Sequence, residues 1–263
     1  MGNVALSIND ATIGYRNGRS VVPVVTAINA TLCAGEVVAL IGMNGAGKST
    51  LLRTLSAFQR PLSGNVEFAK GEVSSLSTAE LAKSVSVVLT ENSFATLTVS
   101  ELVSLGRTPY TGFLGLLTNE DKAVVTAAME RIGVTHLADR VVTTLSDGER
   151  QKCLIAKAIA QETPLMLLDE PTAFLDFRSK VQLFRTLRAL AADDGKAVVV
   201  STHDIEMALR FATKLWLICD GCLYEGSAQE LAVDGLLQRF IDGDGIVYDK
   251  ENNRIEITHE GAV

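Results

Sequence analysis

Several residues in this sequence have the types and the spacing needed to handle phosphates. The first group is the glycine-rich loop Gly42-Met43-Asn44-Gly45-Ala46-Gly47-Lys48-Ser49-Thr50. Its glycines let several N–H groups turn toward one anion, Lys48 can reach β- and γ-phosphates, and the Ser49 hydroxyl can bind Mg²⁺. The alternative is an accidental match, expected in about one chain in a hundred of this length.

Two adjacent carboxylates and one histidine could complete a phosphate-handling site. Asp169 and Glu170 follow the apolar run 165–168, and His203 follows the run 197–201. Asp169 suits a partner of Mg²⁺, Glu170 could orient or deprotonate a water molecule, and His203 could contact a phosphate. Taken alone, the carboxylates could equally form an ordinary acidic turn, and a lone histidine is usually a surface or core residue.

Buried strands are the elements that would bring these groups together. The runs 36–41, 165–168 and 197–201 are short and apolar, which predicts buried strands. Each run ends at one of the groups above, and α/β folds bind ligands at the carboxyl ends of their strands. Residues 51–55 read as the first turns of a helix, whose N-terminus adds partial positive charge beside the loop. The pattern therefore predicts a nucleotide site on an α/β core.

The middle of the chain has a different character from its two ends. Residues 99–105 and 119–132 carry apolar side chains at helical spacing. We interpret this region, about 92–161, as a helical subdomain inserted into the α/β core. Other predicted elements are strands at 4–8, 21–26, 65–68 and 85–89, helices at 178–192 and 236–241, and a hairpin at 246–249 and 254–257.

Composition excludes some classes of function. The chain has 263 residues, 47% of them hydrophobic, which is ample for a large core. A net charge of −7 argues against a nucleic-acid surface. No apolar run approaches the roughly 18 residues of a membrane span, and the N-terminal residues lack the pattern of a signal peptide. We therefore expect a soluble intracellular protein.

The four cysteines include one closely spaced pair, Cys219-Asp220-Gly221-Cys222. A zinc site would need two more ligands at related spacing, and Cys33 and Cys153 are isolated. Asp-Gly between two apolar runs is instead typical of a two-residue hairpin turn. We therefore predict a hairpin here, with reduced thiols.

The segment Leu145-Ser146-Asp147-Gly148-Glu149-Arg150-Gln151 resembles the signature motif of the ATP-binding cassette (ABC) ATPases, usually written L-S-G-G-Q/E. The resemblance covers roughly residues 4–240 and leaves 241–263 as a hairpin-like tail. It implies a P-loop NTPase core with an antiparallel β subdomain and an inserted helical subdomain.

The resemblance also implies a role for each candidate residue. Gly42–Thr50 matches the Walker A loop, 165–170 matches Walker B, and 173–176 matches the D-loop. Glu170, His203 and Lys48 would be catalytic, with His203 as the switch histidine, and Tyr15 would stack on adenine. Mg²⁺ would be held by Ser49, Asp169 and the residue at position 90. The implied nucleotide contacts are Tyr15, Gly42, Asn44, Gly45, Ala46, Gly47, Lys48, Ser49, Thr50, Ser146, Gly148 and Glu149.

Two positions depart from the family pattern. Thr90 stands where family members usually carry a glutamine that reaches Mg²⁺ and the attacking water. Asp147 replaces the first signature glycine, while Ser146 and Gly148 keep the family's γ-phosphate contacts. A carboxylate so near a triphosphate is unfavourable unless it points away or finds a cation.

Less specific motifs narrow the resemblance to one group of importer ATPases. Two segments resemble the corresponding segments of ATPases that serve iron-siderophore, haem and cobalamin permeases. They are Gly106-Arg107-Thr108-Pro109-Tyr110, which follows 98–102, and 160–162, which follows the signature motif. Such a subunit would bind ATP in a head-to-tail dimer with a second copy of itself. It would work at the cytoplasmic face of the inner membrane, against a permease that is a separate polypeptide.

Two other classes compete with this interpretation. One is a soluble ABC ATPase acting in translation or DNA repair, which would usually carry two cassettes or a long insertion. The other is a binding-only regulatory module, which would lack Glu170 or His203. The sequence has both residues and shows neither a second cassette nor such an insertion.

Overall fold

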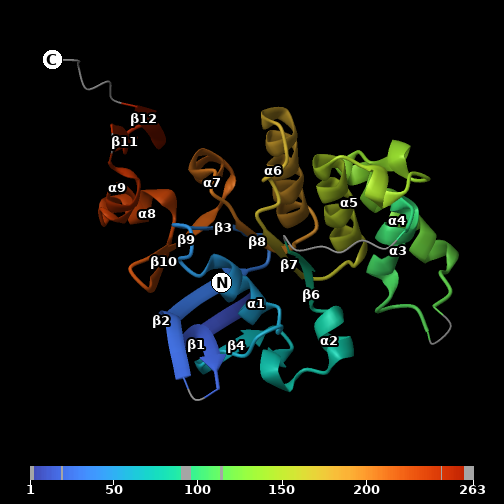
Figure 1. Cartoon of the computed structure of the whole chain (residues 1–263), viewed down its shortest axis with the longest axis horizontal. Coiled ribbons are helices and arrows are strands. Elements are labelled where there is room, and N and C mark those ends of the chain that lie inside the picture. The colour runs from blue at the N-terminus through green and yellow to red at the C-terminus, as the bar shows by residue number, and fades with distance from the viewer. Residues whose placement is uncertain (1–2, 19, 90–95, 113–114, 244, 258–263) are drawn as a thin grey trace.

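The structure is a computed structural model that describes residues 3–18, 20–89, 96–112, 115–243 and 245–257. The described strands form three sheets (Figure 1). The central sheet has six strands, and all its neighbouring pairs are parallel except β10 with β9. In spatial order its strands are β10 (Cys222–Gly226), β9 (Lys214–Cys219), β3 (Val37–Gly42), β8 (Ala197–Ser201), β7 (Leu165–Asp169) and β6 (Val85–Val88).

Strands β3, β7 and β8 are buried on both faces, which is why each is a continuous run of mainly apolar residues. Along β7, Leu165 and Leu167 belong to one core cluster, whereas Met166 and Leu168 belong to another. Successive strand residues point to opposite faces, so each cluster marks one face. The expected strands at 36–41, 165–168 and 197–201 are confirmed.

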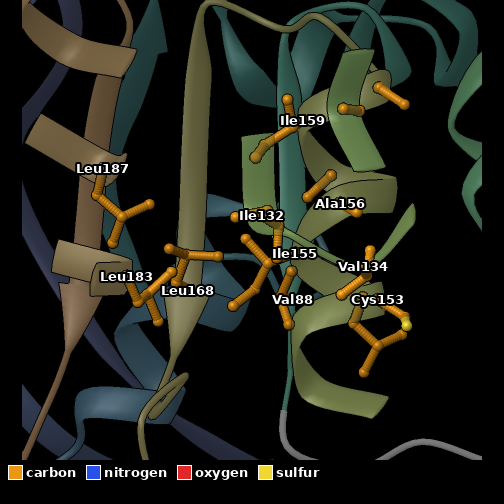
Figure 2. Close-up of a cluster of buried hydrophobic side chains, with 14 of the residues drawn as sticks. Val88, Ile132, Val134, Cys153, Ile155, Ala156, Ile159, Leu168, Leu183 and Leu187 are labelled. Carbon is orange, nitrogen blue, oxygen red and sulfur yellow. The ribbon is translucent and has the colours of Figure 1, made fainter. Parts of the chain in front are cut away.

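Different layers cover the two faces. Helix α1 (Lys48–Leu55) and the antiparallel sheet lie in the cluster with Leu165. Helices α5 (Asp147–Ala160) and α6 (Phe177–Ala192) lie in the cluster with Leu168. Figure 2 shows Leu168 among side chains of both helices. The phosphate loop and the signature segment are therefore carried on opposite sides of the sheet.

The antiparallel sheet has the order β2-β1-β4-β5 and contains much longer strands than the sequence indicated. The expected runs 4–8 and 21–26 are parts of two fourteen-residue strands. Alternation breaks where the strand register shifts, next to Asp10 (φ 47°) and Ala27 (φ 51°). These irregularities hid the continuity of the strands. Their bounds are β1 Val4–Asn17, β2 Ser20–Cys33, β4 Ser63–Phe68 and β5 Gly71–Glu72.

The helical region packs α3 (Val99–Ser104) and α4 (Asn119–Ile132) against α5. The helix expected at 119–132 is confirmed, and the one at 99–105 ends one residue early, where a 3₁₀ turn over Leu105–Arg107 begins. Threonines cap both helices: the Thr98 and Thr118 side chains accept N–H bonds at the third helical position.

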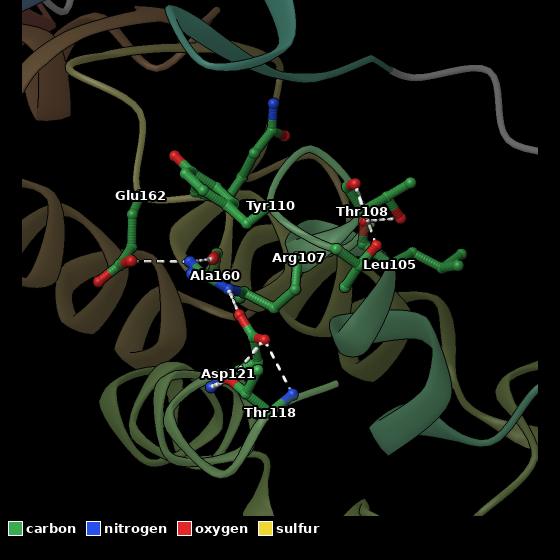
Figure 3. A network of polar contacts seen from close by, with 10 residues as sticks. Leu105, Arg107, Thr108, Tyr110, Thr118, Asp121, Ala160 and Glu162 are labelled. Atoms are coloured by element: carbon green, nitrogen blue, oxygen red, sulfur yellow. Dashed lines mark hydrogen bonds and ion pairs between the residues drawn. The ribbon is translucent and has the colours of Figure 1, made fainter. Parts of the chain in front are cut away.

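A buried arginine holds this region together (Figure 3). Arg107 Nε donates to Asp121 of α4 at 2.9 Å, and its Nη1 donates to the Ala160 carbonyl at 2.9 Å and to Glu162 at 2.7 Å. Its guanidinium carbon also lies 4.2 Å from the centre of the Tyr110 ring. One side chain therefore joins the 3₁₀ turn, the start of α4 and the end of α5.

Gln161 connects this helical region to the central sheet. Its Nε2 donates to the carbonyls of Ala82 at 2.7 Å and Val85 at 3.1 Å, where β6 begins. The Tyr110 hydroxyl donates to the Gln161 carbonyl at 3.0 Å. The end of α5 is thus bonded both to its own region and to the sheet edge.

Both predicted hairpins are present. Cys219 and Cys222 pair across an Asp220-Gly221 turn in which both residues have positive φ, and all four cysteines are free thiols. In the tail, β11 (Ile246–Asp249) pairs with β12 (Arg254–Ile257). The remaining helices are α2 (Thr78–Ala82), α7 (Ile205–Phe211), α8 (Ala228–Val233) and α9 (Leu236–Ile241). None of the helices in the described part of the chain has the length and apolarity required to span a bilayer.

Candidate functional site

The glycine-rich loop connects the end of β3 to the first residue of α1, as the sequence predicts. Gly45 and Gly47 have φ angles of 76° and 110°, in the region that favours glycine. A Cβ on Gly47 would lie 2.8 Å from Val24 Cγ1, so that position has no room for a side chain. No side chain of the described residues caps α1. Its first N–H groups therefore stay available to an anion.

Lys48 lies at the base of this loop and is only 5% exposed. Its Nζ donates to the carbonyls of Gly42 at 2.8 Å and Met43 at 3.2 Å. Burial lowers the pKa of the ammonium, and the carboxylates of Glu170 and Asp169 raise it in part. The lysine and the two carboxylates thus act on one another across the same end of the sheet.

The carboxylate pair lies where the sequence predicts, at the carboxyl end of β7. Asp169 is its last residue and is buried. Glu170 follows with φ 48°, a left-handed conformation that residues other than glycine rarely adopt. Its Oε1 lies 2.5 Å from His203 Nε2, beyond the end of β8. The structure therefore brings Lys48, Asp169, Glu170 and His203 to one edge of the sheet.

One further polar residue lies at this edge and was not predicted from the sequence. Ser201 ends β8, and its hydroxyl bonds to Asp169 and to the backbone of Glu170. A polar residue at the end of an otherwise apolar strand was the available signal. Its two partners depend on β8 lying next to β7, which the sequence did not give.

Tyr15 of β1 lies beside the helix that the loop starts. Its hydroxyl is 2.7 Å from Thr50 Oγ1, and half of the residue's surface is exposed. A tyrosine anchored at its hydroxyl and open to solvent elsewhere can offer its ring to a flat partner.

The signature segment forms the start of α5. Ser146 is the N-cap: its Oγ lies 2.8 Å from Glu149 Oε2 and accepts the Glu149 N–H at 3.3 Å. The hydrogen bonds from Ser146, and then the charges of Arg140 and His136, lower the pKa of Glu149. This capping box fixes the hydroxyl and the carboxylate at the helix start.

Asp147 has a cationic partner, because its Oδ1 lies 3.0 Å from Arg150 Nη1. A cation one turn along the helix therefore compensates the added charge. Gly148 contacts the D-loop: a Cβ there would lie 2.9 Å from the Phe174 carbonyl. Signature and D-loop residues line one open hollow, which includes Ser146, Gly148, Glu149, Phe174, Asp176 and Ser179 but no residue of the phosphate loop.

The donors at the sheet edge fit Mg²⁺. The Ser49 hydroxyl and the Asp169 carboxylate are the hard oxygen ligands that this ion prefers, and Mg²⁺ usually takes few protein ligands beside phosphates and water. The described residues contain no cluster of three or more His, Cys, Asp or Glu side chains suited to a metal. The third expected ligand, Thr90, lies outside the described residues.

Comparisons with known proteins agree with this arrangement. A family model described as ABC transporter matches residues 25–173, more than half of the chain. The chain is 41% identical over 214 residues to an uncharacterized ABC transporter ATP-binding protein of Methanocaldococcus jannaschii, covering 81% of this chain and 72% of that protein. It is 35% identical over 253 residues to the iron(3+)-hydroxamate import ATP-binding protein FhuC of Bacillus subtilis, covering 95% and 93%.

A third relative is longer than this chain. The cobalamin import ATP-binding protein BtuD of Halobacterium salinarum is 40% identical over 202 residues, which cover 76% of this chain but only 50% of that protein.

Solved structures give the same family. A putative metal-chelate type ABC transporter in an inward-facing conformation superimposes with a TM-score of 0.76 at 30% identity, covering 90% of this chain and 89% of that one. A dimeric ATP-binding cassette bound to ADP and Pi also reaches 0.76, at 27% identity, with coverages of 84% and 98%. A family match over more than half of the chain, supported by relatives this similar, means that the chain belongs to the ABC transporter family, as one of its ATPases.

Proposed function

We propose that this chain is the ATP-hydrolysing subunit of an importer for an iron-siderophore, haem or cobalamin. The observation that carries the proposal is the sheet edge at which Glu170 contacts His203 and faces Lys48. Its relatives named for iron-hydroxamate and cobalamin import support the substrate class. Neither relative favours the alternative role in translation or DNA repair.

Each residue of the site has its own role in ATP binding or hydrolysis. The N–H groups of the loop and the Lys48 ammonium bind the phosphates, and Tyr15 offers its ring to adenine. Ser49 and Asp169 would hold Mg²⁺, which would neutralise phosphate charge when bound. Glu170 orients the attacking water and accepts its proton. His203 holds the Glu170 carboxylate in place and contacts the γ-phosphate.

The signature segment serves the site of a second copy. Its hollow is lined by residues of the signature segment, the D-loop and α6 and by none of the phosphate loop, which supports contact with a nucleotide bound by a facing subunit. In a head-to-tail dimer, Ser146, Gly148 and Glu149 of one copy close over the triphosphate bound by the other. Closure and release would drive a separate membrane permease at the cytoplasmic face of the cell membrane.

Mixing two inactive variants tests this shared site. Lys48→Ala should lose its own nucleotide, and Ser146→Arg should damage the site of the facing copy. Mixed dimers contain one site with two intact halves, so we expect ATPase activity to recover in part. The shared site is wrong if neither the mixture nor a covalently linked pair associates in the presence of ATP.

Uptake measurements test the cargo. Cells in which the gene carries Glu170→Gln should lose uptake of one labelled substrate among a ferric siderophore, haem and cobalamin. Unchanged uptake of all three would contradict the importer assignment without affecting the ATPase assignment.

A further inference from the structure

Ser201 lies at the centre of the carboxylate edge, with a hydroxyl bonded on both sides. The residue is completely buried. Its Oγ donates to Asp169 Oδ1 at 2.6 Å and accepts the backbone N–H of Glu170 at 2.8 Å. A serine hydroxyl has one proton to donate, and that proton is directed at the Asp169 carboxylate.

The pairing of the strands explains this position. β7 and β8 are parallel, and Asp169 is directly opposite Ser201 in the register. Opposite residues point to the same face of a sheet, so the carboxylate and the hydroxyl are neighbours. The chain then turns into the left-handed conformation of Glu170, which directs the next N–H to the same hydroxyl.

Glu170 is also held at its other end. His203, two residues after Ser201, contacts the Glu170 carboxylate at 2.5 Å. One short segment therefore holds the main-chain amide of Glu170 through Ser201 and its carboxylate through His203. A left-handed non-glycine residue persists only where the surrounding bonds maintain it.

We propose that Ser201 is a positioning residue for ATP hydrolysis. It fixes the orientation of the Asp169 carboxylate toward Mg²⁺ and the peptide that aims Glu170 at the water. The proposal rests on the roles of Asp169 and Glu170 given above. Without the hydroxyl, the Glu170 N–H loses its bond in a partly buried place, and the Asp169 carboxylate loses the donor that orients it.

Strand β6, on the other side of β7 from β8, supplies a matched control. Ser86 of β6 is equally buried, and its hydroxyl has no hydrogen-bond partner among the described residues. Ser86→Ala and Ser201→Ala thus delete the same atom from the two strands that flank β7 in one sheet. Only the second deletion removes bonds to the site.

The experiment compares Ser201→Ala, Ser86→Ala and the parent. We expect Ser201→Ala to lower kcat by about 10- to 100-fold and to raise the Mg²⁺ concentration needed for half-maximal rate, as for other groups that orient a metal ligand. The affinity for ATP in EDTA should be unchanged, because the phosphate loop is intact. Ser86→Ala should match the parent, and Ser201→Thr should restore most of the rate because it keeps a hydroxyl.

A binding measurement gives a readout that does not depend on turnover. In the Glu170→Gln background, titration with a fluorescent ATP analogue with and without Mg²⁺ should show that Ser201→Ala loses most of the gain in affinity from Mg²⁺. Ser86→Ala should keep that gain. This titration tests the role of Ser201 even if Ser201→Thr does not fold. It also works if the parent binds Mg²⁺-ATP but does not hydrolyse it. That last result would refute the proposed function, not the role of Ser201.

Two results would overturn the proposal. One is a Ser201→Ala variant whose kcat and Mg²⁺ dependence both equal those of Ser86→Ala. The other is a loss of kcat that follows a lower unfolding temperature of the nucleotide-free protein, with the Mg²⁺ effect on affinity unchanged. The second result would make Ser201 a purely structural residue.

Discussion

A substitution at Gly106 tests how closely the 3₁₀ turn packs against α5. A Cβ at this position would lie 2.4 Å from the carbonyl oxygen of Lys157, in the last turns of α5. Ordinary contacts of a Cβ are 3.4–4 Å, so Gly106→Ala forces the 3₁₀ turn and the helix apart by about 1 Å. The obstacle is helix backbone and cannot rotate away.

The size of the effect follows from this geometry. Overpacking of this kind costs about 1–3 kcal/mol. Arg107, the next residue, bonds the Ala160 carbonyl at 2.9 Å, and the same displacement would strain that bond. At about 2–4 °C per kcal/mol for a chain of this size, the unfolding temperature should fall by roughly 4–8 °C for a loss of about 2 kcal/mol.

Thermal unfolding followed by circular dichroism measures this loss. The control is Gly112→Ala, because a Cβ there would meet no described atom within 4 Å and the backbone does not have positive φ. Gly112→Ala should stay within about 0.5 kcal/mol of the parent. Equal unfolding temperatures for the two variants would refute the close packing of Gly106 on α5.

Two further predictions concern titratable groups. Burial raises the pKa of the Cys153 thiol to about 12. A thiol reagent should therefore label exposed Cys222 quickly in the native protein and Cys153 only after unfolding. Fast labelling of Cys153 in the native Cys222→Ser variant would contradict this prediction. Hydrogen bonds from Thr118, and then the contact with Arg107, lower the pKa of Asp121 to about 2. The ionised Asp121 carboxylate therefore contributes to stability above its ordinary pKa near 4, and this contribution is lost as pH falls toward 2. The loss of stability caused by Asp121→Asn in urea unfolding should therefore shrink between pH 5 and pH 3, and a loss that stays constant over this range would count against the charged contact.

The sequence predicts the central strands well because a strand buried on both faces is a continuous apolar run. The runs that became β3, β7 and β8 are apolar throughout and end in the residues of the site. Their carboxyl ends meet at one edge, so parallel pairing places Glu170 and His203 at the same edge, while their direct contact also requires β8 to lie beside β7. The helix over Asn119–Ile132 was equally visible, from the helical spacing of its apolar residues.

Other features depend on which elements become neighbours. The bonds of Ser201 require β8 to lie beside β7, and the contacts of Arg107 join residues up to 55 positions apart. Such partners are chosen by tertiary packing and leave no local pattern. The lengths of β1 and β2 were missed for a different reason, since irregularities near Asp10 and Ala27 interrupt the alternation that marks a strand.

The most direct test of the account is the Glu170→Gln variant, examined for turnover and for assembly together. If Glu170 is the base of a site shared between two copies, turnover should fall by about 100-fold or more, since general base catalysis is worth about that much. ATP should still bind, and with Mg²⁺ the variant should elute from a sizing column as an ATP-bound dimer, while ADP leaves it monomeric. Turnover within a few-fold of the parent, or the absence of any ATP-dependent dimer, would contradict the account.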